Sequence, residues 1–508
     1  MSGMLNSILW LPIIGTLAVL FVPSHKHNYI RWVSLLATSI TFMLTLVLYY
    51  LYDSSIANTA NVFMVKHEWI KSFNIFYTLG VDGLSLPMVV LNGLLFLLCV
   101  LSSWHIEKKV KAYFSLMLIL QSSIFGVFFA LDFFLFYIYW EVMLIPMFFL
   151  IALWGGEDRE RAAVKFILYT FFGSILMLVG VIALYYVSGK NADSLNIIAL
   201  QGGKFSQEVI TLWGKSLSFE KIFFWIMFLG FAIKVPMVPF HTWLPHAHVQ
   251  APTAVSVILA GVLLKMGAYG FLRISFPIFP QAAAEYSNII AFLGLISILH
   301  GAFCALAQTD VKKLVAYSSV SHMGFVMLGL ASLSVQGVNG AVMQMFNHGT
   351  STAMMFLLIG ILYERSHHRY IVKPDGSRGF SGLAIQMPIF TIIFLIGMFA
   401  SIGLPGMSGF VSEFLIFLGS FNIFTLYTVL AAIGLFFGAA YLLWMYKRMF
   451  FGEVSAEVKE YSDVTKLEVG YMVPLCFLVI VLGFYPAPLI NVMKSSVGFF
   501  VKQMVGLQ

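Results

Sequence analysis

Lys234 is the only formal charge in the apolar run Ile222–Phe240, and Pro236 and Pro239 follow it directly. A lysine at membrane depth costs at least about 2.5–3.5 kcal/mol on insertion scales. A helix that carries prolines there must satisfy its freed backbone groups with partners other than lipid. A buried lysine beside an interrupted helix is typical of an ion or proton path.

Other ionisable side chains lie within apolar runs. A helical rise of 1.5 Å per residue places Glu141 about 13.5 Å past Asp132 and Lys265 about 12 Å from Arg273. Glu413 lies in the second half of a long apolar stretch that contains several glycines. By the same arithmetic three histidines lie about 15–18 Å deep: His300, His322 and His348.

An isolated ionisable side chain at these depths would become neutral, because burial disfavours its charged form. A pair formed by Glu141 and Lys234 would keep both charges, and separating the pair would change the protonation of both groups. This is a two-group proton switch. Lys265 and the deep histidines could pass the proton on, since imidazole titrates near neutral pH.

Structural interpretations of the same residues also exist. Each deep carboxylate or lysine could form a merely structural buried pair, and each deep histidine could be satisfied by packing. Lys165 lies four residues after Arg161 and could extend to the membrane interface. Lys312 and Lys313 could anchor a loop.

Metal binding is not indicated by the sequence. The segment HTWLPHAH offers His241, His246 and His248, but Pro245 interrupts the helix and neither carboxylate nor cysteine joins them. The three cysteines stand singly in apolar segments: Cys99, Cys304 and Cys476. We therefore expect neither a structural zinc nor an iron–sulfur cluster bound by this chain alone.

The composition indicates a polytopic membrane protein. Of 508 residues, 60% are hydrophobic and 10% charged, whereas soluble chains carry about 25% charged residues. The net charge of +7 does not indicate nucleic-acid binding, because most basic residues lie in short loops. The longest loops, near 52–83, 188–220 and 452–469, are too small for a nucleotide or flavin domain.

The elements that must position these residues are about fourteen membrane helices. The stretch 384–418 is too long for one straight helix, and Gly403, Pro405 and Gly406 predict a second interruption. The first span lacks a preceding basic region and predicts a retained helix. The expected spans are 4–22, 30–51, 84–103, 112–131, 133–154, 162–187, 221–244, 251–275, 288–308, 311–331, 336–363, 384–418, 422–449 and 470–493.

The distribution of basic residues predicts the orientation. Lysines and arginines gather in the loops on one side of the expected spans, and that side should be cytoplasmic. Both termini are then expected outside. Only Lys165, Lys234 and Lys265 fall within spans.

Five segments together carry a resemblance to a known family. The chain resembles the proton-pumping membrane subunits of respiratory complex I, which are similar to the large subunits of multi-subunit sodium/proton antiporters. The resemblance covers nearly the whole chain and rests on YWEVMLIPMFFLIALWG, FAIKVPMVPFHTWLPHAHVQAPTAVSVILAGVLLKMGAYG, AQTDVKKLVAYSSVSHMGF, MFNHGTSTAMMF and GLPGMSGFVSEF.

This resemblance implies an all-α integral membrane fold of fourteen helices with two inverted five-helix repeats, each containing a broken helix. Its expected parts, within one polytopic domain 1–508, are helices 1–3 in 1–111, the first repeat in 112–275, the second in 288–449 and helix 14 in 470–508.

The resemblance also implies roles for individual residues. Glu141 and Lys234 are then the input pair, Lys265 the central relay and Glu413 the terminal group toward the outside. Glutamate at 413 distinguishes one branch of the family, because the antiporter subunits and the sibling pump chains tend to have lysine there. Further relay positions are implied at His322, His348 and Lys165, and the depth of His300 adds it as a candidate.

The implied function is proton translocation as a non-redox subunit of an NADH:quinone oxidoreductase in a bacterial cytoplasmic membrane. No cofactor is expected on this chain, and FMN, iron–sulfur clusters, NADH and quinone belong to partner subunits. Expected partners are other membrane subunits, including sibling antiporter-like chains, and the lipid bilayer, with no nucleic acid. The alternative is a subunit of a cation/proton antiporter or of a related membrane-bound hydrogenase or photosynthetic complex, and a stand-alone solute transporter fits less well.

Overall fold

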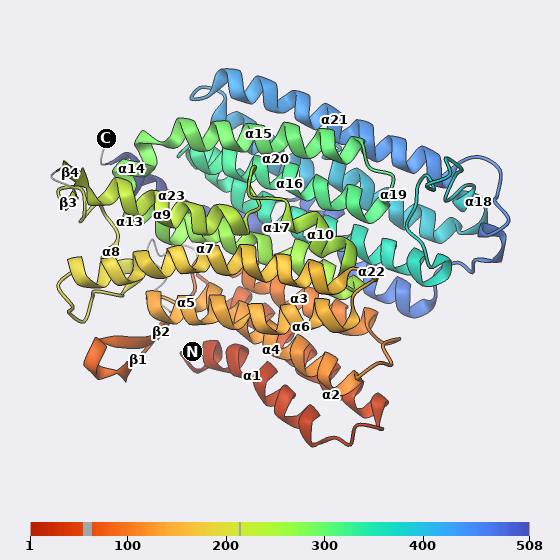
Figure 1. Ribbon diagram of the computed structural model, residues 1–508, viewed down its shortest axis with the longest axis horizontal. Coiled ribbons are helices and arrows are strands. Elements are labelled where there is room, and N and C mark those ends of the chain that lie inside the picture. The colour runs from red at the N-terminus through yellow and green to blue at the C-terminus, as the bar shows by residue number, and fades with distance from the viewer. Residues whose placement is uncertain (1, 54–62, 213–214, 507–508) are drawn as a thin grey trace.

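Helices that run along one common direction make up nearly all of the fold (Figure 1). The computed structural model describes residues 2–53, 63–212 and 215–506. Residues 54–62 of the expected loop 52–83 therefore lie outside the described residues. Two antiparallel hairpins, formed by β1 (Val65–Ile70) with β2 (Ile75–Leu79) and by β3 (Val209–Leu212) with β4 (Lys215–Ser218), lie at the end of the molecule that also holds both termini.

The prediction of an all-helical membrane protein is confirmed. In the described part of the chain, 11 helices are long and apolar enough to cross a membrane, and three shorter apolar helices accompany them. The first part of the chain forms α1 (Ser2–Phe21), α2 (His27–Leu51), the short η2 (Lys71–Phe73), α3 (Leu86–Ser102), α4 (Val110–Phe129), α5 (Phe133–Val142), α6 (Leu144–Trp154), α7 (Arg159–Val187) and α8 (Ile197–Leu200).

The predicted interruption after Lys234 is confirmed. Helix α9 (Phe219–Lys234) ends at the lysine, and α10 (Trp243–Gln250) begins beyond the two prolines. Trp243 Nε1 donates to the carbonyl of Ile233 at 2.9 Å. Protein groups, not lipid, thus satisfy backbone at the break, as the bilayer requires.

The second predicted interruption is also present. Helix α19 (Pro388–Ile402) ends at Gly403, whose φ is +76°, and α20 (Ser408–Ser420) starts after Gly406, whose φ is +92°. Both values lie in the left-handed region that glycine adopts without steric cost.

The predicted span 133–154 is confirmed as one span, Phe133–Trp154. Within it one irregular turn at Met143 separates α5, which ends at Val142, from α6, which begins at Leu144. Pro146 has no N–H for the carbonyl four residues earlier, which weakens the helix at this point. This turn falls two residues after Glu141.

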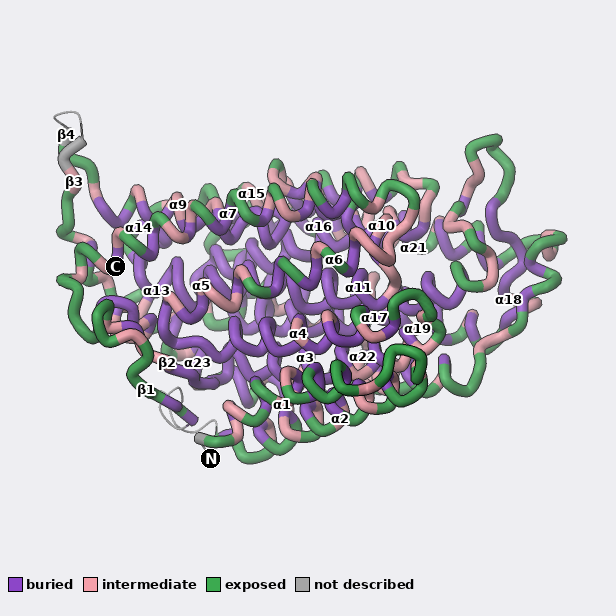
Figure 2. Tube along the Cα trace, turned by 60° about the horizontal axis from the view of Figure 1, so that its bottom comes forward, coloured by how far each residue is buried: buried purple, intermediate pink, exposed green. Residues whose placement is uncertain are grey.

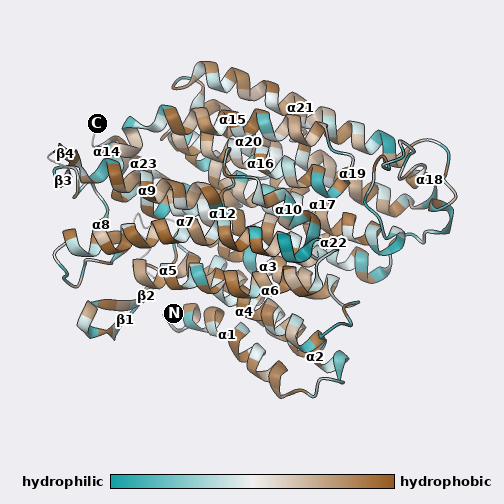
Figure 3. Ribbon diagram, in the orientation of Figure 1, coloured by the Kyte–Doolittle hydropathy of each residue, from teal (hydrophilic) through white to brown (hydrophobic). Residues whose placement is uncertain are grey.

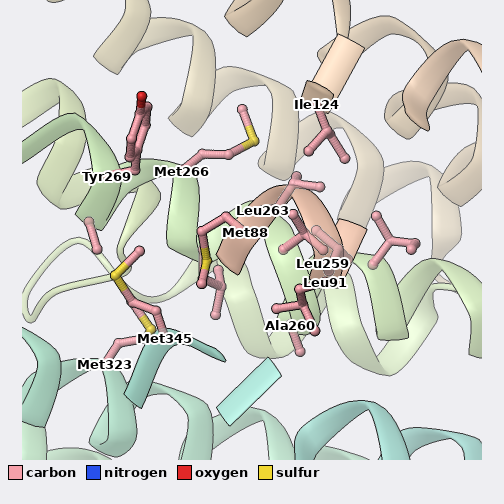
Figure 4. Close-up of a cluster of buried hydrophobic side chains, with 14 of the residues drawn as sticks. Met88, Leu91, Ile124, Leu259, Ala260, Leu263, Met266, Tyr269, Met323 and Met345 are labelled. Atoms are coloured by element: carbon pink, nitrogen blue, oxygen red, sulfur yellow. The ribbon is translucent and has the colours of Figure 1, made fainter. Parts of the chain in front are cut away.

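The helix that carries Lys265 occupies the centre of the molecule. It runs through α11 (Thr253–Ile258), the π-helical η3 (Leu259–Leu263), α12 (Leu264–Gly270), the π-helical η4 (Phe271–Ser275) and α13 (Phe276–Ile278). Figure 4 shows Leu259, Leu263 and Met266 among side chains of neighbouring helices, including Met88 and Ile124. π-Helical turns inside α-helices are frequent at functional sites, and here two of them flank Lys265.

The remaining chain completes the bundle. The expected span 470–493 is divided in the structure, because Pro486 cannot extend the preceding helix and a second helix begins there. These elements are α14 (Pro280–Glu285), α15 (Ser287–Leu306), α16 (Val311–Ala331), α17 (Val335–Ser366), α18 (Leu383–Gln386), α21 (Thr425–Phe450), η5 (Val458–Glu460), α22 (Lys466–Phe484) and α23 (Ala487–Val505).

Burial and hydropathy are arranged as in a membrane protein. The central helices α3, α4, α11 and α17 are buried almost throughout, while α1, α2 and α21 are exposed along one side (Figure 2). The exposed sides are themselves apolar: Phe21 is 89% exposed and Phe436 70%. Hydrophilic residues gather in the loop region around α18 (Figure 3). An apolar surface around a core that contains charges suits a lipid surrounding.

Candidate functional site

Lys265 and His348 meet at the centre of the molecule. Lys265 Nζ lies 2.7 Å from His348 Nδ1, and the lysine also donates to the carbonyl of Ala260 in the adjacent π-helical turn. Lys265 is completely buried and His348 is 3% exposed. A charged lysine donates to Nδ1, so the imidazole proton then lies on Nε2, which has no partner among the described residues.

From His348 the polar groups continue to Glu413. The rings of His348 and His322 have centroids 5.4 Å apart. His322 Nδ1 lies 3.3 Å from Glu413 Oε1. Helices α12, α17, α16 and α20 thus each contribute one ionisable side chain to a continuous row, which we call the central row: Lys265, His348, His322 and Glu413.

Gln344 bridges two members of the central row, His322 and Glu413, and was missed in the sequence. Its Nε2 lies 3.2 Å from Glu413 Oε1 and 3.3 Å from His322 Nδ1. Ser412 Oγ donates to its Oε1 at 2.5 Å. The signal was the spacing, because Gln344 stands one helical turn before His348 on α17 and such pairs share a face.

Glu141 and Lys234 do not form the direct ion pair that the sequence suggested. The two charges interact electrostatically, but among the described residues no ion pair within 4.0 Å joins them. Lys234 Nζ lies 3.7 Å from Met143 Sδ and 5.3 Å from the ring centroid of Trp140. Met143 is the residue at the irregular turn between α5 and α6, so this turn has a sulfur atom beside the lysine.

Close packing places the helix of Lys265 directly against that of Lys234. A β-carbon at Gly267 would stand 2.8 Å from the backbone nitrogen of Val235. Within the described residues, no hydrogen bond or ion pair links the two lysines themselves. The structure therefore has two polar groups: the pair Glu141 and Lys234, and the central row.

Lys165 and His300 lie apart from the central row. His300 is exposed, with Nε2 3.4 Å from Cys304 Sγ and its ring centroid 4.9 Å from that of His241. Lys165 Nζ lies 5.9 Å from the ring centroid of Tyr169 on the same helix. The structure brings neither residue into contact with Glu413 or Lys265.

A cavity between the end of α6, the start of α11 and the last part of α17 is lined by two basic residues. It has a volume of about 120 Å³ and its lining includes Lys312, which is 7% exposed, and Arg369. Lys312 Nζ donates to the carbonyl of Ala251 at 2.5 Å. His248 interacts electrostatically with both Lys312 and Lys265, and neither of its ring nitrogens has a partner among the described residues.

Proton movement is the chemistry that these groups can perform. Neighbouring members of the central row lie within one hydrogen bond or one ring contact of each other, and each can take up or release a proton. Within the described residues, no group of three His, Cys, Asp or Glu side chains is arranged to hold a metal ion.

Comparison with known proteins gives one family and several close relatives. Residues 130–425 match the family described as NADH:quinone oxidoreductase/Mrp antiporter, TM. A NADH-quinone oxidoreductase subunit M from Rhodobacter capsulatus is 41% identical, covering 99% of this chain and 97% of its own. A NADH-ubiquinone oxidoreductase chain 4 from Chondrus crispus is also 41% identical, over 96% and 95% of the two chains.

Two solved structures share the fold. A chain of respiratory complex I from Thermus thermophilus matches with a TM-score of 0.86 and 28% identity, covering 98% of this chain and 99% of that one. A chain of the Mrp complex from a Dietzia species matches with a TM-score of 0.81 over 99% of both chains. Its identity is 18%, so this second match supports the fold alone.

Proposed function

The chain belongs to the family of transmembrane subunits of NADH:quinone oxidoreductases and Mrp antiporters, and we propose that it translocates protons as the M-type, or chain 4, subunit of an NADH:quinone oxidoreductase. In this function quinone reduction in partner subunits drives protons through this chain. The chain itself carries no redox step, and FMN, iron–sulfur clusters, NADH and quinone lie in those partners.

One observation carries the proposal: the central row is continuous and buried. Lys265 lies 2.7 Å from His348, and His322 lies 3.3 Å from Glu413. Burying a row of ionisable side chains inside the membrane costs free energy. A protein that served only as a membrane anchor would not require such a row, whereas a proton path does.

The proposed roles follow the position of each group. Glu141 and Lys234 form the input pair, with an electrostatic coupling that changes as either group gains or loses a proton. Lys265 is the central relay, His348 and His322 pass the proton on, and Glu413 is the terminal group toward the outside. Lys165 and His300 are accessory relay positions, since each stands apart from the central row.

The proposed setting is a bacterial cytoplasmic membrane, with both termini outside and sibling antiporter-like chains as neighbours. Both termini lie at the same end of the bundle, as an even number of crossings requires. Within the chain, we propose an inverted relation between 112–275 and 288–449, each of which contains one of the two predicted interruptions.

A cation/proton antiporter subunit is the second candidate, supported by the shared fold with the Mrp complex. The two functions differ in their assembly. Purification of the chain with its neighbours should bring flavin and iron–sulfur proteins with an oxidoreductase, and none with an antiporter.

The function is tested by substitutions at the input pair. Lys234→Ala and Glu141→Ala should abolish NADH-driven acidification in proteoliposomes while the complex still assembles. Lys494→Ala is the control, because this exposed lysine lies on α23, outside both polar groups. Lys234→Arg keeps a charge and should retain part of the pumping. Full pumping by either alanine variant would contradict the proposed switch.

A further inference from the structure

A groove opens at the end of the bundle opposite to the termini and the hairpins. It lies between the end of α1, the start of α4 and the end of α6, and has a volume of about 760 Å³. Ligand sites commonly have volumes of about 300–1,000 Å³. Two short segments, within 20–27 and 109–116, line it together with Phe149 and Leu153 of α6.

The mouth of this groove is basic. Lys109, Lys111, His25 and His27 line it, and its lining contains no carboxylate. Lys111 Nζ donates to the carbonyl of Leu20 at 2.7 Å, which fixes the ammonium at the groove and leaves two N–H donors free. The Lys109 side chain makes no hydrogen bond within the described residues. The mouth thus offers unused donors and positive charge at one place.

The deeper part of the groove is apolar. Leu116, Phe149 and Leu153 point along the membrane-spanning parts of α4 and α6, and Phe149 is 43% exposed. One polar atom interrupts this wall: Ser115 Oγ is buried and has no partner among the described residues. A basic mouth above an apolar wall is the arrangement that receives an anionic headgroup and an acyl chain together.

We propose that this groove binds one anionic phospholipid, with its phosphodiester at Lys109 and Lys111 and an acyl chain along Phe149 and Leu116. The occupant is a lipid because the apolar wall continues into the spanning part of the helices, where acyl chains lie. The headgroup is anionic because the mouth holds cations without a counterion. This assignment is independent of the proton path, since the groove shares no residue with either polar group.

The lipid can be identified by photocrosslinking in the intact complex. Phe149 is replaced by benzoylphenylalanine, and the complex is placed in nanodiscs of equimolar phosphatidylglycerol and phosphatidylcholine with the same acyl chains. After illumination, mass spectrometry counts the lipid adducts on this chain. Because each lysine near an anionic headgroup contributes a factor of about five, phosphatidylglycerol adducts should exceed phosphatidylcholine adducts by on the order of 25-fold.

Two double substitutions distinguish lipid binding by the groove lysines from a general effect of positive surface charge. In Lys109→Gln/Lys111→Gln the adduct ratio should fall close to one. Lys459→Gln/Lys466→Gln removes two exposed lysines of η5 and of the start of α22, outside the groove, and should leave the ratio unchanged. A ratio near one in the unsubstituted groove, equal losses in both pairs, or adducts to a partner protein instead of lipid would each overturn the assignment.

Discussion

Glu413 Oε2 lies against Gly403, so close that a β-carbon at this glycine would stand 2.5 Å from the carboxylate oxygen. Gly403 also has a φ of +76° at the end of α19. Position 403 is therefore restricted to glycine by the backbone and by the carboxylate. The interruption of this helix holds the last group of the central row in place.

Gly403→Ala tests this relation. Alanine in the left-handed region costs about 1–2 kcal/mol, and its β-carbon would displace the carboxylate from His322. We expect strongly reduced proton pumping with a modest loss of thermal stability. Gly470→Ala is the control, because a β-carbon there meets no atom within 4 Å. Unchanged pumping in Gly403→Ala would show that Glu413 does not need this position.

Gln344→Leu tests whether the bridging amide belongs to the path. Leucine has a similar volume but removes the hydrogen bond to Glu413 and the contact with His322. Since a transfer step depends on the positioning of donor and acceptor, we expect NADH-driven acidification in proteoliposomes to fall about tenfold or more. Gln344→Glu, whose carboxyl can donate to Glu413 when protonated, should recover part of it. Gln281→Leu, at an exposed glutamine, should have no effect. Equal pumping by Gln344→Leu and Gln281→Leu would exclude Gln344 from the path.

The buried ion pair between Asp82 and Arg273 should matter for stability. Arg273 Nη2 lies 2.5 Å from Asp82 Oδ2, and both side chains are less than 10% exposed. Removing one partner of a buried pair costs about 3–5 kcal/mol, because it leaves an uncompensated charge. Asp82→Asn should therefore lower the unfolding temperature of the purified complex clearly. The double variant Asp82→Asn/Arg273→Met should be more stable than Asp82→Asn alone, and the opposite order would contradict this account.

The exposed pair of Lys373 and Glu457 should behave differently. Lys373 Nζ donates to Glu457 Oε1 at 2.8 Å, and this hydrogen bond lowers the pKa of Glu457 below its usual value of 4.5. A carboxyl whose pKa is lower in the folded than in the unfolded protein stabilises the folded state at pH values above the unfolded pKa. This stabilisation is lost as the pH falls through the folded pKa. Because the pair is exposed, the effect is small. Glu457→Gln should lower the unfolding temperature slightly at pH 7 and not at all once the pH is below the folded pKa. A larger difference at low pH would contradict the sign.

The interruptions of the helices show which structural features can be predicted from the local sequence. Pro236 and Pro239 predicted the end of α9, and Gly403 with Gly406 predicted the end of α19, because each acts on its own backbone. The irregular turn at Met143, inside the confirmed span Phe133–Trp154, was not predicted, because the single Pro146 perturbs the helix without ending it. Its consequence, a sulfur beside Lys234, depends on the partner helix.

The site was predictable in its members and much less in its contacts. Lys265, His322 and His348 were found from their depth and Glu413 from its place after the second interruption, and the structure joins these four residues. Glu141 and Lys234 were expected as a pair, but among the described residues no ion pair within 4.0 Å joins them, and Lys234 Nζ lies 3.7 Å from Met143 Sδ. Gln344 carries no charge, so the search for charged groups at depth did not reach it.

The sequence by itself determined the membrane setting, most of the spans and the depth of Glu141, Lys234 and Lys265, because the rise of a helix is fixed and depth follows from counting along one chain. The tertiary structure alone decided which groups at the same depth touch. That depends on how α12, α16, α17 and α20 rotate and approach each other, and close contacts of glycines such as Gly267 and Gly403 set those distances. Depth is a property of one helix, whereas a proton path is a property of several packed together.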